Sequence, residues 1–141
     1  MRYIMDTDHL SLAQRRHPQV VAQLLAVSPD QRAITIITVD EQLKGRLAQV
    51  RNAPDPATLT HAYRHLQETL LSLTALHIMP FDMAAGEQFA ALRGQGIRIG
   101  TQDLRIAAIC LVHAATIVTR NARDFRQVPN LRIIDWTTTR R

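Results

Sequence analysis

Four acidic side chains lie near segments that are expected to form strands: Asp6, Glu41 and Asp124 follow such segments, and Asp103 opens the helix that precedes one. Carboxylates that are brought together repel each other, and each then prefers to take up a proton. A hard divalent cation relieves that repulsion. Ligand sets made of oxygen, without His or Cys, favour Mg²⁺ or Mn²⁺ over zinc. These acids therefore make a magnesium- or manganese-binding site a hypothesis worth testing.

The charge of the chain suggests what such a site would act on. The net charge is +5, and Lys44 is the only lysine, so the basic charge is almost entirely arginine. Arginine binds flat, bidentate anions such as phosphate, and a basic surface favours nucleic acid or an acidic protein as partner. A bound metal ion activates water and neutralises charge on a phosphate. The combination indicates phosphodiester hydrolysis, although a GC-rich genome would also enrich arginine.

Each acid also has a purely structural interpretation. Thr38–Glu41 has the S/T-x-x-E pattern of a capping box, which would explain Glu41 without a metal. Asp103 could interact with the helix dipole, with Thr101 as the cap. The other acids could be helix caps or turn residues: Asp6, Asp8 and Asp124.

The elements that must position these acids alternate between strands and helices. Strands are expected at residues 2–5, 33–38, 77–81, 115–119 and 131–135. Helices are expected at residues 10–16, 19–27, 39–51, 57–76, 82–93 and from about 101 to 113. This alternation predicts an α/β fold with a central, mostly parallel sheet flanked by helices. Ligands bind beyond the carboxyl ends of such strands, where the acids would meet.

Length and composition are consistent with one domain spanning residues 1–141, rich enough in apolar side chains to bury a core. No stretch is apolar enough to span a membrane, and the first five residues are too short to be a signal peptide. Cys110 lies in an apolar run and is expected to be a buried, unpaired thiol. Together these features favour the cytoplasm.

Four segments carry a resemblance to a known family: Asp6–Leu10, Thr38–Leu43, Ile99–Ala108 and Val118–Phe125. In this order and spacing they resemble the motifs of PIN-domain ribonucleases, and most closely the VapC toxins of type II toxin–antitoxin systems. The resemblance reaches from Asp6 to Trp136. It implies a PIN-like fold and cleavage of RNA that depends on Mg²⁺ or Mn²⁺.

The resemblance also implies residue roles. Asp6 and Asp103 would be the principal metal ligands, and Glu41 a direct or outer acid. Many relatives have Asp where this chain has Asn121, so Asp124 would supply the missing charge. A metal-activated water would attack the phosphorus in line. Supporting residues would be Thr7, Asp8, Thr119 and Asn121, and RNA phosphates could contact Arg98, Arg105, Arg120, Arg123 and Arg126.

Relatives of this kind pair with a small antitoxin and often form homodimers. The apolar stripe of the longest helix could serve such contacts, although core packing is the expected use for Leu59, Tyr63, Leu66, Leu70 and Leu73. His61 and His65 are expected on an exposed helix face, His9 on the surface, and Trp136 as a lid on the sheet edge. Met5, Met79 and Met83 are expected in the core.

Two other functions are compatible with parts of the pattern. A phospho-accepting receiver domain also has acids at strand ends, but it needs a lysine after a late strand. A non-catalytic PIN-like module that binds RNA or protein is the second alternative, and Asn121 is the feature that favours it. Acids argue against a site that only holds RNA, because they repel its phosphates.

Overall fold

The computed structural model describes residues 2–138, and the last residues of the polar tail, 139–141, lie outside this range. Five parallel strands form one sheet in the order β3-β2-β1-β4-β5. Their bounds are Tyr3–Met5 for β1, Arg32–Thr35 for β2, His77–Met79 for β3, Thr116–Val118 for β4 and Arg132–Ile134 for β5. The predicted α/β class with a mostly parallel sheet is confirmed.

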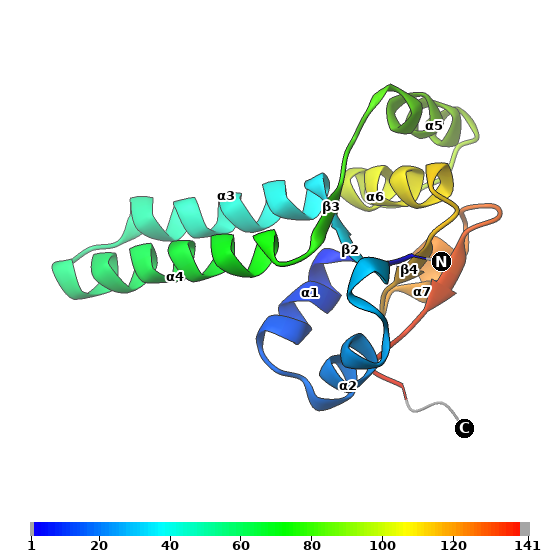
Figure 1. The fold of residues 1–141 in the computed structure, drawn as a ribbon. Coiled ribbons are helices and arrows are strands. Elements are labelled where there is room, and N and C mark those ends of the chain that lie inside the picture. The colour runs from blue at the N-terminus through cyan, green and yellow to red at the C-terminus, as the bar shows by residue number, and fades with distance from the viewer. Residues whose placement is uncertain (1, 139–141) are drawn as a thin grey trace.

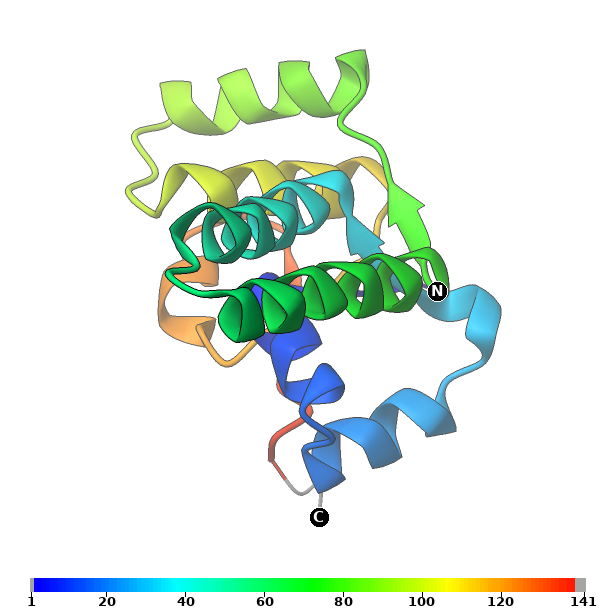
Figure 2. The same ribbon diagram turned by 90° about the vertical axis from the view of Figure 1, so that its left-hand side faces the viewer.

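Helices connect the strands and cover both faces of the sheet (Figure 1). Their bounds are α1 Thr7–Gln14, α2 Pro18–Ala26, α3 Ile36–Asn52, α4 Pro56–Thr74, α5 Met83–Gly94, α6 Thr101–Val112 and α7 Ala122–Phe125. A short 3-10 helix, η1, spans Pro29–Gln31. Figures 1 and 2 show α3 and α4 as a long antiparallel hairpin that extends away from the sheet, with α5 lying over α6.

Successive strand residues belong alternately to two hydrophobic cores, because side chains along a strand point to opposite faces. Ile4, Ala33 and Ile117 pack into the cluster that contains α6. Met5, Ile34 and Val118 pack into the cluster that contains α1, Leu73 and Trp136. β1, β2 and β4 are therefore buried on both faces, which explains why they read as apolar runs, whereas the edge strands β3 and β5 are partly exposed.

Three predicted helix starts that bear on the site were wrong, the first being that of α1, which begins at Thr7 and not at residue 10. The second strand ends at Thr35, whose side chain accepts a hydrogen bond from the backbone N–H of Thr38 and caps α3. The capping-box interpretation of Glu41 is therefore wrong, because this residue lies beyond the first turn. Gly100, and not Thr101, is the N-cap of α6, and it provides no side-chain cap.

The stripe on α4 is mostly exposed, contrary to the expectation of core packing. Leu73 is 1% exposed, but Tyr63 is 55% and Leu70 is 44% exposed. The end of α4 reaches β3, and most contacts of the helix are with α3. Met83 is likewise 77% exposed at the start of α5 rather than in the core.

Other side chains lie where they were expected. Asp82 caps α5 through the backbone N–H of Ala85. Cys110 is buried and unpaired, and burial raises the pKa of its thiol. Over residues 2–138, none of the helices combines the length and apolar character needed to cross a membrane.

Candidate active site

The site begins at the carboxyl end of β1, where Asp6 follows the last strand residue. The backbone N–H of Asp6 donates to the carbonyl of Val118 at the end of β4, over 3.0 Å. The side chain of Asp6 caps α1, because its Oδ1 accepts a 2.8 Å hydrogen bond from the backbone N–H of His9. Asp6 is only 6% exposed, so its carboxylate is fixed by two adjacent strands and a helix N-terminus.

A pocket of about 400 Å³ opens at this edge of the sheet. We call it the acidic hollow, and its lining residues are Asp6, Thr7, Asp8, Glu41, Asp103, Arg120 and Asn121. Three of the four predicted acids line it, although Asp6 is the N-cap of α1, Glu41 lies in α3 and Asp103 lies in α6. The fourth, Asp124, is not among the lining residues. Acids that are far apart in the sequence are therefore brought together in space.

The carboxylate of Glu41 is held by a threonine pair. Thr7 Oγ1 donates to Glu41 Oε1 over 2.8 Å, and it lies 2.9 Å from Thr38 Oγ1. A hydroxyl has one proton, so Thr38 must donate to Thr7 when Thr7 donates to Glu41. Thr7 thus supports a carboxylate, as predicted. The contribution of Thr38 was not predicted.

The repulsion between the acids is visible at Asp103. Partial burial, followed by the charges of Asp6, Glu41 and Asp124, raises the pKa of Asp103 from 3.8 to about 6. No basic side chain offsets this shift. The acidic hollow therefore contains more negative charge than its own residues neutralise.

Asp8 differs from the other acids because it has a cationic partner. Arg120 Nε donates to its Oδ2, and a terminal nitrogen of the same guanidinium donates to its Oδ1, both over 2.8 Å. These bonds lower the pKa of the Asp8 carboxyl. Asp8 was predicted either to cap α1 or to add charge to the site. It does neither, because Asp6 caps the helix and Arg120 neutralises Asp8.

Asn121 and Asp124 form a unit beside the acidic hollow. The amide nitrogen of Asn121 donates to Asp124 Oδ2 over 2.9 Å. The backbone N–H of Asn121 donates to Thr119 Oγ1 over 2.9 Å, so the hydroxyl of Thr119 supports this turn. Asn121 thereby orients Asp124, whose charge acts on Asp103.

His9 was expected on the surface, but the structure places it in the core. It is fully buried, and Trp136, expected as a lid, is 2% exposed and donates its backbone N–H to His9 Nε2 over 3.3 Å. The signal that could have revealed this is its spacing. His9 lies in the first turn after the cap Asp6, where Leu10 and Leu12 also face the core.

The donor atoms of the acidic hollow suit a hard cation. Among residues 2–138, one group of three potential ligand residues has its ligand atoms within 4.8 Å of one another: Asp6, Asp8 and His9. Arg120 occupies both oxygens of Asp8, and Trp136 occupies Nε2 of His9. The carboxylates that have no cationic partner are those of Asp6, Glu41 and Asp103. Mg²⁺ commonly keeps several waters, so such acids can act on it directly or through water.

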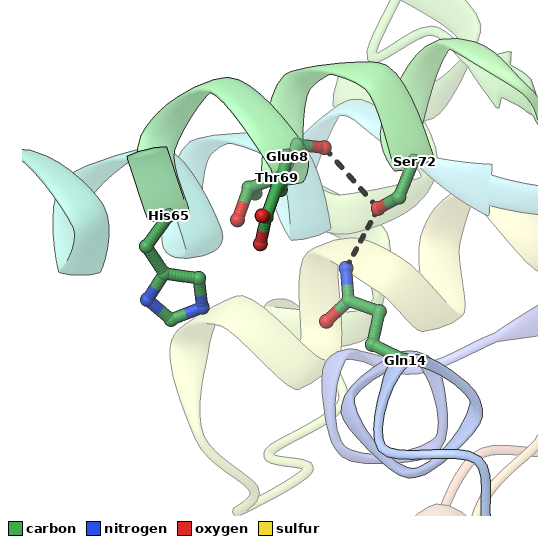
Figure 3. Close-up of a pocket in the computed structure, with 5 residues that line it drawn as sticks. All are labelled: Gln14, His65, Glu68, Thr69 and Ser72. Atoms are coloured by element: carbon green, nitrogen blue, oxygen red, sulfur yellow. Dashed lines mark hydrogen bonds between the residues drawn. The ribbon is translucent and has the colours of Figure 1, made fainter. Parts of the chain in front are cut away.

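A second polar pocket lies between α1 and α4, as Figure 3 shows. It is lined by Gln14, His65, Glu68, Thr69 and Ser72. Gln14 donates to Ser72 Oγ over 3.0 Å, and Ser72 donates to the carbonyl of Thr69 over 3.2 Å. Its polar groups also bond to side chains of α3, and Glu68 is the only acid among its lining residues. This pocket therefore lacks the charge needed to hold a divalent cation.

Comparison with known proteins gives a consistent result. A family model described as the PIN domain matches residues 3–131. The tRNA(fMet)-specific endonuclease VapC of Salmonella typhimurium is 24% identical over 140 residues, covering 96% of this chain and 98% of the relative. The plasmid stability protein StbB of Pseudomonas syringae pv. tomato is 30% identical over 129 residues, covering 86% and 89%. The structure of VapBC2 from Rickettsia felis bound to a DNA fragment from the promoter aligns with a TM-score of 0.73 and 26% identity, over 96% of this chain and 99% of that one.

Proposed function

Because the chain belongs to the PIN-domain family, we propose that it is a cytoplasmic, Mg²⁺- or Mn²⁺-dependent endoribonuclease, the toxin of a type II toxin–antitoxin pair. The observation that carries this proposal is that Asp6, Glu41 and Asp103 line one hollow, where their charges help to raise the pKa of Asp103. Relatives over nearly the whole chain include an endonuclease named for tRNA(fMet). Hydrolysis of RNA is the chemistry that such a site and such relatives have in common.

The residues fit a divalent cation. We assign Asp6 and Asp103 as principal ligands, with Glu41 as a direct or water-mediated ligand. Asp124, held by Asn121, contributes negative charge from a position beside the acidic hollow. A cation would favour the ionised form of Asp103 and so oppose the repulsion that raises its pKa. Oxygen donors alone are expected to select Mg²⁺ or Mn²⁺ over zinc.

Individual residues of the chain would have separate roles in RNA cleavage. A bound divalent cation would lower the pKa of a water and offset charge on the scissile phosphate. Asp6 and Glu41 present carboxylates in fixed orientations, because His9 and Thr7 hold them. Arg120 lies in the acidic hollow beside Asp8, where its guanidinium can also contact a phosphate of the RNA.

We further propose that the protein pairs with a small antitoxin and forms a homodimer. The Rickettsia felis relative is described as VapBC2, a complex bound to its promoter DNA. The exposed apolar side chains of α4, including Tyr63 and Leu70, support a protein contact at that hairpin. Co-expression with the neighbouring small gene followed by size-exclusion chromatography would test both interactions. An isolated monomer that retains no partner would contradict them.

Cleavage assays test the catalytic proposal. Purified protein should cut RNA with Mn²⁺ or Mg²⁺, and EDTA should stop the reaction. Asp103→Asn should reduce the rate by at least about a thousandfold, as expected for the loss of a metal-binding carboxylate. Asp55→Asn is a matched control, because Asp55 is an exposed helix cap and Asn also caps helices well. Cleavage that is indifferent to EDTA and to Asp103→Asn would overturn the proposal.

A non-catalytic RNA- or protein-binding module remains the second candidate, favoured by the neutral side chain of Asn121. It predicts RNA binding without cleavage and without measurable Mn²⁺ binding. The receiver alternative has no such support. Lys44, the only lysine, lies on α3 and pairs with Asp40 over 3.1 Å, away from the end of any late strand.

A further inference from the structure

The buried side chain of His9 has one nitrogen without a hydrogen-bond partner. His9 is 0% exposed, and its Nδ1 is the one buried side-chain polar atom, among the residues described, that lacks a partner. A buried polar group left unpaired costs about 1–3 kcal/mol. That nitrogen lies 3.6 Å from Oδ1 of Asp6. An apolar residue would fill this core position without such a cost, so the imidazole needs a further explanation.

The position of the ring proton follows from the contacts of the other nitrogen. Nε2 accepts the backbone N–H of Trp136 over 3.3 Å, so it presents a lone pair. Asp135 Oδ1 is also 3.5 Å from Nε2, but it already accepts from the backbone and hydroxyl of Thr137, over 2.8 Å and 2.6 Å. A neutral imidazole carries one proton, which must then be on Nδ1 and face Asp6.

We infer that His9 is a positioning residue for Asp6. Its backbone N–H donates to Oδ1 over 2.8 Å, and its Nδ1 lies 3.6 Å from the same oxygen. Oδ2 is thereby left for a ligand in the acidic hollow. If the distance from Nδ1 to Oδ1 shortened by about half an ångström, a second hydrogen bond would form. Such contacts commonly tighten when a site is filled. This inference rests on the proposed metal-dependent function.

The same histidine links Asp6 to the end of the chain. Trp136, which follows β5, is 2% exposed and packs against Tyr3 with ring centroids 5.9 Å apart. Its backbone N–H fixes the imidazole, and the imidazole faces Asp6. Hydrogen-bonded partners behind a metal ligand orient it and raise its affinity for the ion. The C-terminal segment would therefore influence the ion without touching it.

Two side chains of different length separate the roles of the two ring nitrogens. In His9→Asn the amide N–H lies near the position of Nδ1, and in His9→Gln it lies near that of Nε2. We expect His9→Asn to bind Mn²⁺ with a dissociation constant within about threefold of the unaltered protein. His9→Gln and His9→Leu should bind about 10- to 100-fold more weakly. The kcat of RNA cleavage should follow the same order, with little change in KM.

Thermal melts of each variant separate positioning from packing. If the His9→Asn and His9→Gln variants bind Mn²⁺ equally well, the inference is overturned, whatever the stabilities of the two variants. A second measurement needs no variant, because ¹⁵N spectroscopy of the imidazole in metal-free protein identifies the protonated nitrogen. A proton on Nδ1 supports the inference, and a proton on Nε2 overturns it. Failure of the unaltered protein to bind Mn²⁺ or cut RNA would instead overturn the proposed function.

Discussion

The hydroxyl of Thr7 donates a 2.8 Å hydrogen bond to Glu41, a residue 34 positions later in the chain. This bond joins the start of α1 to the second turn of α3 and sets the direction of the Glu41 carboxylate. Thr7 was expected to support a carboxylate, but the sequence did not indicate which one. The contact also explains why a residue of this size and polarity suits the position directly after Asp6.

Removing this hydroxyl should weaken metal binding more than folding. Thr7→Val keeps the volume but leaves Glu41 Oε1 without its donor. We expect a dissociation constant for Mn²⁺ about tenfold higher and a loss of about 1 kcal/mol in the free energy of unfolding. Calorimetric titration with Mn²⁺ and urea unfolding measure the two quantities. Thr38→Val is the control, because Thr7 can still donate to Glu41. Equal Mn²⁺ affinity in both variants and the unaltered protein would contradict this role.

Metal affinity should depend on pH through Asp103. In the metal-free protein its carboxyl has a pKa of about 6, and an ion competes with the proton for it. Below that pH, the affinity for Mn²⁺ should fall by up to about tenfold per pH unit. Titrations between about pH 5 and pH 7.5 would show this slope. An affinity that does not change across this window would mean that Asp103 does not bind the ion.

The same carboxyl should reduce the stability of the metal-free protein at neutral pH. The folded pKa of Asp103 is raised above its ordinary value of 3.8, so its contribution to stability is present below pH 3.8 and is lost as the pH rises through about 6. Because the group is partly exposed, solvent screening reduces the effect to about 1 kcal/mol. Asp103→Asn should therefore unfold at a higher urea concentration at pH 7.5 than the unaltered protein, although it loses cleavage. Near pH 4 the gain should largely disappear. A variant less stable at both pH values would refute this account.

Asp8 should be dispensable for metal binding, because Arg120 occupies both of its oxygens. We expect Asp8→Asn to bind Mn²⁺ within about threefold of the unaltered protein, whereas Asp6→Asn should lose at least about 100-fold. Both partners of the ion pair are nearly half-exposed, at 48% for Arg120 and 44% for Asp8, so breaking it should cost at most about 1 kcal/mol. A loss in Asp8→Asn comparable to that in Asp6→Asn would instead make Asp8 a ligand.

The sequence was sufficient for those features that depend on local patterns. Alternating strands and helices predicted a parallel sheet, and the apolar run at residues 33–38 predicted a strand buried on both faces, although that strand ends at Thr35. Because parallel strands place their carboxyl ends at one edge, Asp6 and Glu41 could be expected to meet. The helix start at Asp82 was also predictable, since a cap depends on residues within a single turn. The assignment of Asp6 and Glu41 as metal ligands stays a prediction.

Only the tertiary structure decided how these side chains are partnered. The bond from Thr35 to the start of α3 removed the capping-box explanation for Glu41, and a strand that ends three residues early cannot be read from β-branched composition. Arg120 meets Asp8 across 112 positions, and His9 is buried because β5 brings Trp136 against it. Periodicity along the chain specifies which face of an element is apolar, but contacts between distant segments depend on how the crossovers place those faces against each other.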